Sequence, residues 1–211
     1  MIRRPPRSTQ GVSSAASDVY KRQSQMGYII FGMGSLYYLG VTGSVFHYVS
    51  HGTGKALLFM AAGSIIMQTG GIRSIRKLGG LGSKLPITGI AAMIGFLAIV
   101  GVPPTNGFQS EWMIFAGAFG GALESGSTFK LIIAALALAG TPITAGYALL
   151  TMRKVFFGTL PKDFENLKDP SPLMTIPLLF LCALTLLIGV FPSVITDNLI
   201  PLLQSTFGGM S

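Results

Sequence analysis

The chain has 211 residues, of which 50% are hydrophobic and 10% are charged, whereas about a quarter of the residues of a soluble domain are charged. Its formal net charge of +8 does not indicate nucleic-acid binding, because the basic residues lie in short segments between long apolar runs. The single cysteine excludes a disulfide framework and an all-cysteine iron–sulfur site within this chain. We therefore expect an all-α, polytopic membrane protein with no metal site and no cofactor on this chain.

Residues 1–23 differ in composition from everything that follows. The segment MIRRPPRSTQGVSSAASDVYKRQ is basic, rich in serine and lacks the apolar core of a secretory signal peptide. It closely resembles translated sequencing-adapter DNA, so we expect it to be disordered and not native; a transit peptide is the alternative. In that case the native protein begins upstream of Ser24 and this chain is its C-terminal portion. The expected organisation is a leader at 1–23, a transmembrane domain at 24–192 and an interfacial tail at 193–211.

The second of two apolar segments, about 24–38 and about 41–69, contains His47, His51 and Lys55. Steps of four residues keep these side chains near one face of a helix, about 6 Å apart along its axis. An ionisable side chain at membrane depth costs about 3 kcal/mol, which makes such a residue a functional candidate. Histidine also titrates near neutral pH. The line therefore predicts a relay for protons.

Each member of this line also has a plainer interpretation. Lys55 would extend to the membrane surface if it lay near a helix end, but about fourteen uncharged residues follow it. His51 and His47 would serve as structural hydrogen-bonding groups. The number of uncharged residues after Lys55 favours the functional interpretation.

The apolar segment 86–122 is interrupted by the sequence GVPPTNGF. Pro103 and Pro104 cannot continue a regular helix, and Gly107 follows them, so we expect one helix broken in mid-course. Irregular backbone at membrane depth occurs where protein or a watery cavity covers it, and broken helices form ion sites in transporters. Glu111 follows the break and is the fourth candidate for the relay. Its plainer role is to stabilise the positive end of the second half-helix.

Two further spans are predicted at about 130–152 and 172–190. The loops at 71–85 and 153–171 both contain basic residues, and basic loops remain on the cytoplasmic side of the membrane. Both loops face the cytoplasm only if 86–122 crosses the membrane once. We therefore expect about five crossings, one of them broken at Pro103–Pro104, and a mildly amphipathic C-terminal tail that lies at the membrane surface.

Five motifs occur in an order that resembles a known family: SQMGY at 24–28, FHYVSHGTGKALLF at 46–59, IRKLGGLGSKLP at 75–86, GVPPTNGFQSEW at 101–112 and AGYALLTMRKVFFG at 145–158. Together they resemble the antiporter-like subunits of respiratory complex I, membrane-bound hydrogenases, archaeal F420H2 dehydrogenases and multisubunit sodium/proton antiporters. The resemblance covers essentially all of 24–190. It implies the second of two inverted five-helix repeats, each with a broken helix, followed by a C-terminal helix.

The resemblance also implies roles for single residues. His47, His51 and Lys55 match the hydrophilic line that connects two half-channels, and Glu111 matches the titratable residue of the second broken helix. Glu111 favours the subunit M or hydrogenase-type branch, whereas the Lys55 motif favours the subunit L or hydrogenase branches.

The implied function is proton translocation within a redox-driven complex of the NADH or F420H2:quinone oxidoreductase or membrane hydrogenase type, in a prokaryotic inner or plasma membrane. The implied partners are other membrane subunits, lipids, and protons or Na+, with no nucleic acid. Redox cofactors would belong to the partners, so no catalytic chemistry is expected on this chain. Two alternatives remain open: a component of a multisubunit sodium/proton antiporter, and a structural membrane subunit without ion conduction.

Overall fold

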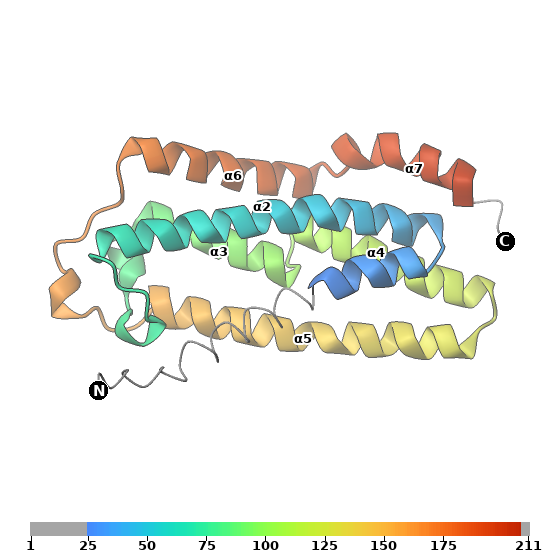
Figure 1. The fold of residues 1–211 in the computed structure, drawn as a ribbon, viewed down its shortest axis with the longest axis horizontal. Coiled ribbons are helices and arrows are strands. Elements are labelled where there is room, and N and C mark those ends of the chain that lie inside the picture. The colour runs from blue at the N-terminus through green and yellow to red at the C-terminus, as the bar shows by residue number, and fades with distance from the viewer. Residues whose placement is uncertain (1–24, 208–211) are drawn as a thin grey trace, which may run out of the picture.

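The computed structural model describes residues 25–207, and over that range the chain forms a bundle of helices with no strand (Figure 1). The predicted all-α class is confirmed. The prediction of a disordered leader at 1–23 falls outside the described residues. The helices are a segment at 25–34, α2 (Tyr38–Gln68), α3 (Pro86–Val100), α4 (Asn106–Glu124), α5 (Thr128–Phe156), α6 (Pro172–Val190) and α7 (Ser193–Phe207), with short 3-10 turns η1 (Ile75–Lys77), η2 (Leu81–Ser83) and η3 (Lys162–Phe164) in the loops.

Helix α2 is the central element of the bundle. It runs along most of the length of the molecule and contacts α3, α4, α6 and α7 (Figure 1). Helices α3 and α4 follow one another beside α2, and α5 returns along both of them. Helices α6 and α7 again follow one another in the same direction. Helix α2 therefore has neighbouring helices on several sides.

The break in the segment 86–122 is confirmed. Helix α3 ends at Val100, the backbone of Gly101 turns into the left-handed region with φ 71°, and α4 begins at Asn106. Pro103 and Pro104 lie between the two helices, where no regular helical hydrogen bond is required of them. Because α3 and α4 continue in the same direction, the two halves form one interrupted element (Figure 1).

The loops at 71–85 and 153–171 meet at one end of the bundle. The backbone nitrogen of Gly80 donates to the carbonyl oxygen of Phe157 at 3.4 Å. The Asp169 carboxylate accepts hydrogen bonds from the backbone nitrogens of Ile87 and Thr88 at 3.0 Å each, which satisfies free donors at the start of α3. The two loops therefore lie at the same end of the bundle. This is the arrangement expected if α3 and α4 together cross the membrane once.

The bundle buries small polar side chains and exposes large apolar ones. Ser44, Asn106 and Ser110 are completely buried, whereas Leu173 is 84% exposed and Ile143 is 75% exposed. Such a surface suits lipid, because apolar side chains on the outside gain nothing from contact with water. Helices α5 and α6 are each long and apolar enough to cross a membrane.

Helix α7 packs against α2 instead of leaving the bundle. Ile195 and Ile200 of α7 pack on a cluster formed by Phe46, Met113 and Ile188. The predicted surface location of the tail at 193–211 concerns the membrane and stays a prediction.

Glycines allow α2 and α4 to approach closely. A Cβ added to Gly43 would lie 2.6 Å from the backbone nitrogen of Ile114 and 2.9 Å from Cβ of Met113, and one added to Gly117 would collide with the backbone of Gly40. Small residues at such crossings are the usual way for membrane helices to gain packing contacts.

This crossing predicts a difference between two glycines of the same helix. Gly43→Ala should lower stability by about 1–3 kcal/mol, because its methyl group overlaps the backbone of α4. Gly63→Ala is the matched control, since a Cβ at Gly63 meets nothing within 4 Å, and alanine favours a helix by about 1 kcal/mol. The melting temperatures of the two variants in detergent measure the difference. An unchanged melting temperature for Gly43→Ala would contradict this packing.

Candidate functional site

His47 lies inside the bundle and connects three helical segments. It is 2% exposed, and its Nδ1 lies 3.0 Å from Oγ of Ser110 on α4. Its Nε2 lies 2.9 Å from Oε1 of Gln25 in the segment 25–34. The ring of Tyr28 stands edge-on to the imidazole at a centroid distance of 5.9 Å. Both ring nitrogens of His47 therefore have a polar neighbour, although the ring is shielded from bulk solvent.

His51 and Lys55 continue the line along α2. The rings of His47 and His51 are stacked, with centroids 5.9 Å apart and planes inclined by 13°. His51 is 8% exposed, and its Nε2 is buried without a hydrogen-bond partner among the described residues. Lys55 is half-buried. The structure thus places all three predicted residues on one face of α2, as their spacing indicates.

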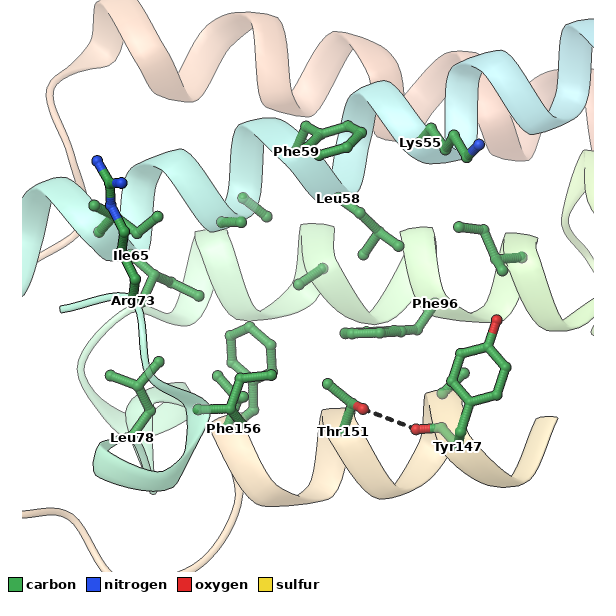
Figure 2. Close-up of a pocket in the computed structure, with 18 of the residues that line it drawn as sticks. Lys55, Leu58, Phe59, Ile65, Arg73, Leu78, Phe96, Tyr147, Thr151 and Phe156 are labelled. Carbon is green, nitrogen blue, oxygen red and sulfur yellow. Dashed lines mark hydrogen bonds between the residues drawn. The ribbon is translucent and has the colours of Figure 1, made fainter. Parts of the chain in front are cut away.

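A groove of about 440 Å³ adjoins this line, and both His51 and Lys55 contribute to its wall. Figure 2 shows Lys55 of α2 and Tyr147 of α5 near one end of the groove and Arg73 near the other. The walls between them are mainly apolar and include Leu58, Phe59, Phe96 and Phe156. Lys55 therefore lies at one end of a mainly apolar groove between α2, α3 and α5.

Glu111 lies one turn after the start of α4 and is half-buried. Its carboxylate group packs against Gly101 at the end of α3, so that a Cβ on Gly101 would lie 2.9 Å from Cδ of Glu111. The carboxylate therefore points back to the break between the two helices. Gly107 has a related role, because a Cβ there would collide with the carbonyl oxygen of Ala98 in α3.

The start of α4 is fixed to α2 by hydrogen bonds. Oγ of Ser50 donates to the carbonyl oxygen of Asn106 at 3.2 Å, and Nδ2 of Asn106 donates to Oγ1 of Thr53 at 2.9 Å. Asn106 is completely buried. These bonds hold the break beside the same stretch of α2 that contains His51.

The four predicted relay residues are brought to one region by two different elements. The histidines and Lys55 lie on α2, and Glu111 lies on α4 next to Ser110, which contacts His47. Glu111 itself faces the break and contributes no atom to the wall of the groove. Among residues 25–207, no group of three His, Cys, Asp or Glu side chains lies close enough together to hold a metal ion.

Sequence reasoning missed three residues of the site: Gln25, Asn106 and Ser110. All three are small or neutral polar residues, which carry no charge signal and are common in helix packing. Gln25 lies in the motif SQMGY and the other two lie in GVPPTNGFQSEW. Their position within the motifs that carry the family resemblance was the only available signal.

Comparison with known proteins identifies the family of this chain. Residues 19–136 match the model of the family described as "NADH:quinone oxidoreductase/Mrp antiporter, TM". The chain belongs to this family. It is 33% identical over 181 residues to F(420)H(2) dehydrogenase subunit M of Methanosarcina mazei, covering 86% of this chain and 35% of the relative.

Two further similarities are to an antiporter subunit and to a chain of respiratory complex I. The chain is 34% identical over 203 residues to a Na(+)/H(+) antiporter subunit from Alkalihalophilus pseudofirmus, with 86% of this chain and 25% of the relative covered. Its fold is similar to a chain of respiratory complex I from Thermus thermophilus, with a TM-score of 0.75 and 30% identity, covering 88% of this chain and 37% of the other. The chain thus spans about a third or less of the length of these relatives. It is an integral membrane protein of the antiporter-like family.

The contact between Gly101 and Glu111 predicts a specific effect on the carboxylate. Gly101→Ala should displace the Glu111 carboxylate and shift its carboxyl infrared band, which a Glu111→Gln variant would assign. Gly126→Ala is the matched control, because Gly126 also has a positive φ of 58° but a Cβ there meets nothing within 4 Å. Both variants should lose about 1 kcal/mol of stability from backbone strain, and only Gly101→Ala should change the band. Identical spectra for Gly101→Ala and Gly126→Ala would contradict the placement of Glu111.

Proposed function

We propose that this chain translocates protons across the membrane as part of a redox-driven complex. The main support is the line of His47, His51 and Lys55 on α2, which is enclosed by a bundle with an apolar outer surface. Burying three ionisable side chains within the membrane costs free energy, and a helix bundle can pack without them. Their presence is explained if they exchange protons.

The broken helix supplies the second half of the proposed path. The interruption between α3 and α4 places Glu111 beside irregular backbone within the bundle, which is the arrangement in which membrane transporters bind ions. Ser110 connects α4 with His47 at 3.0 Å. Protons would therefore pass between Glu111 on α4 and the line on α2, with water filling the remaining distances.

The driving force would come from outside this chain. We propose that redox chemistry occurs on partner subunits and that charge changes relayed from neighbouring membrane subunits alter the proton affinity of Lys55 and Glu111. A relative of this chain is a subunit of F(420)H(2) dehydrogenase, and another similar chain belongs to respiratory complex I. These similarities support a redox-driven complex as the context.

A second candidate is a component of a multisubunit sodium/proton antiporter. One of the relatives belongs to a Na(+)/H(+) antiporter, and it is as similar in sequence as the dehydrogenase subunit. Sodium-dependent proton exchange in vesicles without an electron donor would favour this candidate. Proton pumping that needs an electron donor and is independent of sodium would favour the redox-driven complex.

The orientation in the membrane is part of the proposal. The loops at 71–85 and 153–171 would face the cytoplasm of a prokaryotic cell, because the first contains Arg73, Arg76, Lys77 and Lys84 with no acidic residue. Residues 24–192 would form the transmembrane domain, and 193–211 would lie at the membrane surface. A cysteine introduced at Lys77 and labelled with a membrane-impermeant reagent from one side would test this orientation.

The proposed path predicts a loss of pumping without a loss of assembly. In the intact complex reconstituted in vesicles, Lys55→Ala and Glu111→Gln should each reduce proton pumping at least about tenfold, because each removes a group that binds and releases a proton. Lys130→Ala and Glu124→Gln are matched controls, since both residues are exposed at the opposite end of the bundle from the basic loops. The measurements are the rate of vesicle acidification and the amount of assembled complex.

Two outcomes would contradict the proposal. Normal pumping in both Lys55→Ala and Glu111→Gln would remove these residues from the path. Loss of the assembled complex in Lys55→Ala, with full pumping in whatever complex remains, would favour a structural role in which the ionisable residues only pair with one another.

A further inference from the structure

His47 is enclosed between two polar side chains that do not titrate near neutral pH. Oγ of Ser110 lies 3.0 Å from Nδ1, and Oε1 of Gln25 lies 2.9 Å from Nε2. Ser110 is completely buried and Gln25 is 2% exposed, so neither neighbour is a surface group. The two nitrogens of His47 therefore face partners with different chemical properties.

The hydroxyl of Ser110 has two hydrogen-bond acceptors within reach. Besides Nδ1 of His47, the carbonyl oxygen of Gly107 lies 2.9 Å from Oγ. When His47 is neutral and carries its hydrogen on Nε2, the Ser110 hydroxyl donates to Nδ1. When His47 carries both hydrogens, Nδ1–H donates to Oγ and the hydroxyl turns to the carbonyl oxygen of Gly107. In both states the two ring nitrogens of His47 and the hydroxyl of Ser110 are hydrogen-bonded, without movement of any heavier atom.

The other side of the ring behaves differently. Oε1 of Gln25 accepts the hydrogen on Nε2 in both states of His47. A carboxamide neither gains nor loses a proton near neutral pH, so it cannot pass this hydrogen on. Gln25 thus orients the ring and closes the Nε2 side to proton exchange.

The stacking with His51 gives no direct alternative route. Both nitrogens of His47 already face Ser110 and Gln25, and Nε2 of His51 has no hydrogen-bond partner among the described residues. Proton transfer between His47 and His51 would need intervening water. The group that connects Nδ1 with another helix is Ser110 on α4, next to Glu111 in the sequence.

We propose that His47 exchanges its proton through Nδ1 by way of the Ser110 hydroxyl, while Gln25 fixes the hydrogen on Nε2. The inference rests on the proposed function and names the route by which one of its residues is loaded. An O–H bond of a protonated water breaks and its proton binds to Oγ of Ser110, which leaves a neutral water. The original O–H bond of Ser110 breaks at the same time, and its proton moves to Nδ1 of His47. One proton enters and one N–H bond forms, with no change of oxidation state. His47 is then a loading site supplied from α4.

The tautomer of His47 tests the arrangement without any measurement of pumping. The chain contains only two histidines, so incorporation of 15N-histidine into this chain alone, within the intact complex, gives imidazole signals from His47 and His51 only. A His51→Gln variant assigns the two signals. We expect neutral His47 to carry its hydrogen on Nε2 and to accept a hydrogen bond at Nδ1. A hydrogen on Nδ1 in neutral His47 would overturn the proposal, because Ser110 could then no longer donate to that nitrogen.

A serine variant tests the route itself. Ser110→Ala should slow proton pumping at least about tenfold and remove the hydrogen-bond signature at Nδ1, while the hydrogen on Nε2 remains. Ser64→Ala is the matched control, because Ser64 is 1% exposed and its hydroxyl donates only to the carbonyl oxygen of Met60 within α2. Pumping by Ser64→Ala should equal that of the unaltered complex. Wild-type pumping by Ser110→Ala would overturn the route.

The experiments distinguish an error in the route through Ser110 from an error in the proposed function. If Lys55→Ala and Glu111→Gln lose pumping but Ser110→Ala pumps normally, the function stands and the route through Ser110 is wrong. If Ser110→Ala no longer assembles, the tautomer of His47 in the unaltered complex still decides the outcome. If neutral His47 carries its hydrogen on Nε2 while Lys55→Ala and Glu111→Gln pump normally, the hydrogen-bond arrangement stands and the proposed function is wrong.

Discussion

The break between α3 and α4 determines how the neighbouring helices pack. Backbone groups released from a helix at membrane depth must find partners inside the protein. Ser50 and Thr53 of α2 bond to Asn106 at the start of α4, and a Cβ on Gly189 of α6 would overlap the backbone of Thr105 and Asn106. Helices α2 and α6 therefore meet at the break. Their close packing fixes where α4 begins and hence where Ser110 and Glu111 lie.

Packing and function are joined in the same helices. Gly43 lets the backbone of α4 approach α2, and one turn further along α2 the imidazole of His47 reaches Ser110 across the same crossing. A larger residue at Gly43 would move the two helices apart and lengthen that hydrogen bond. Small residues at this crossing thus provide the short distances that the proposed proton exchange between helices would require, since a hydrogen bond weakens beyond about 3.2 Å.

The family includes subunits of complexes with different names. Relatives of similar identity include one subunit of F(420)H(2) dehydrogenase and one of a sodium/proton antiporter. The broken helix and the line on α2 belong to one compact bundle. Under the proposed function, the ion that passes would depend on the groups around Lys55 and Glu111. The shared fold therefore does not by itself identify the function of a family member.

Local patterns along the chain predicted the helical class, the break at Pro103–Pro104 and the line of His47, His51 and Lys55, because apolar runs, proline and four-residue spacing act along one helix. The packing of the helices was needed to show that Gln25 and Ser110 enclose His47 and that the Glu111 carboxylate packs against Gly101. Those contacts join residues distant in sequence through neutral groups. Neutral side chains leave no periodic or charge pattern, so their partners follow only from how the helices pack.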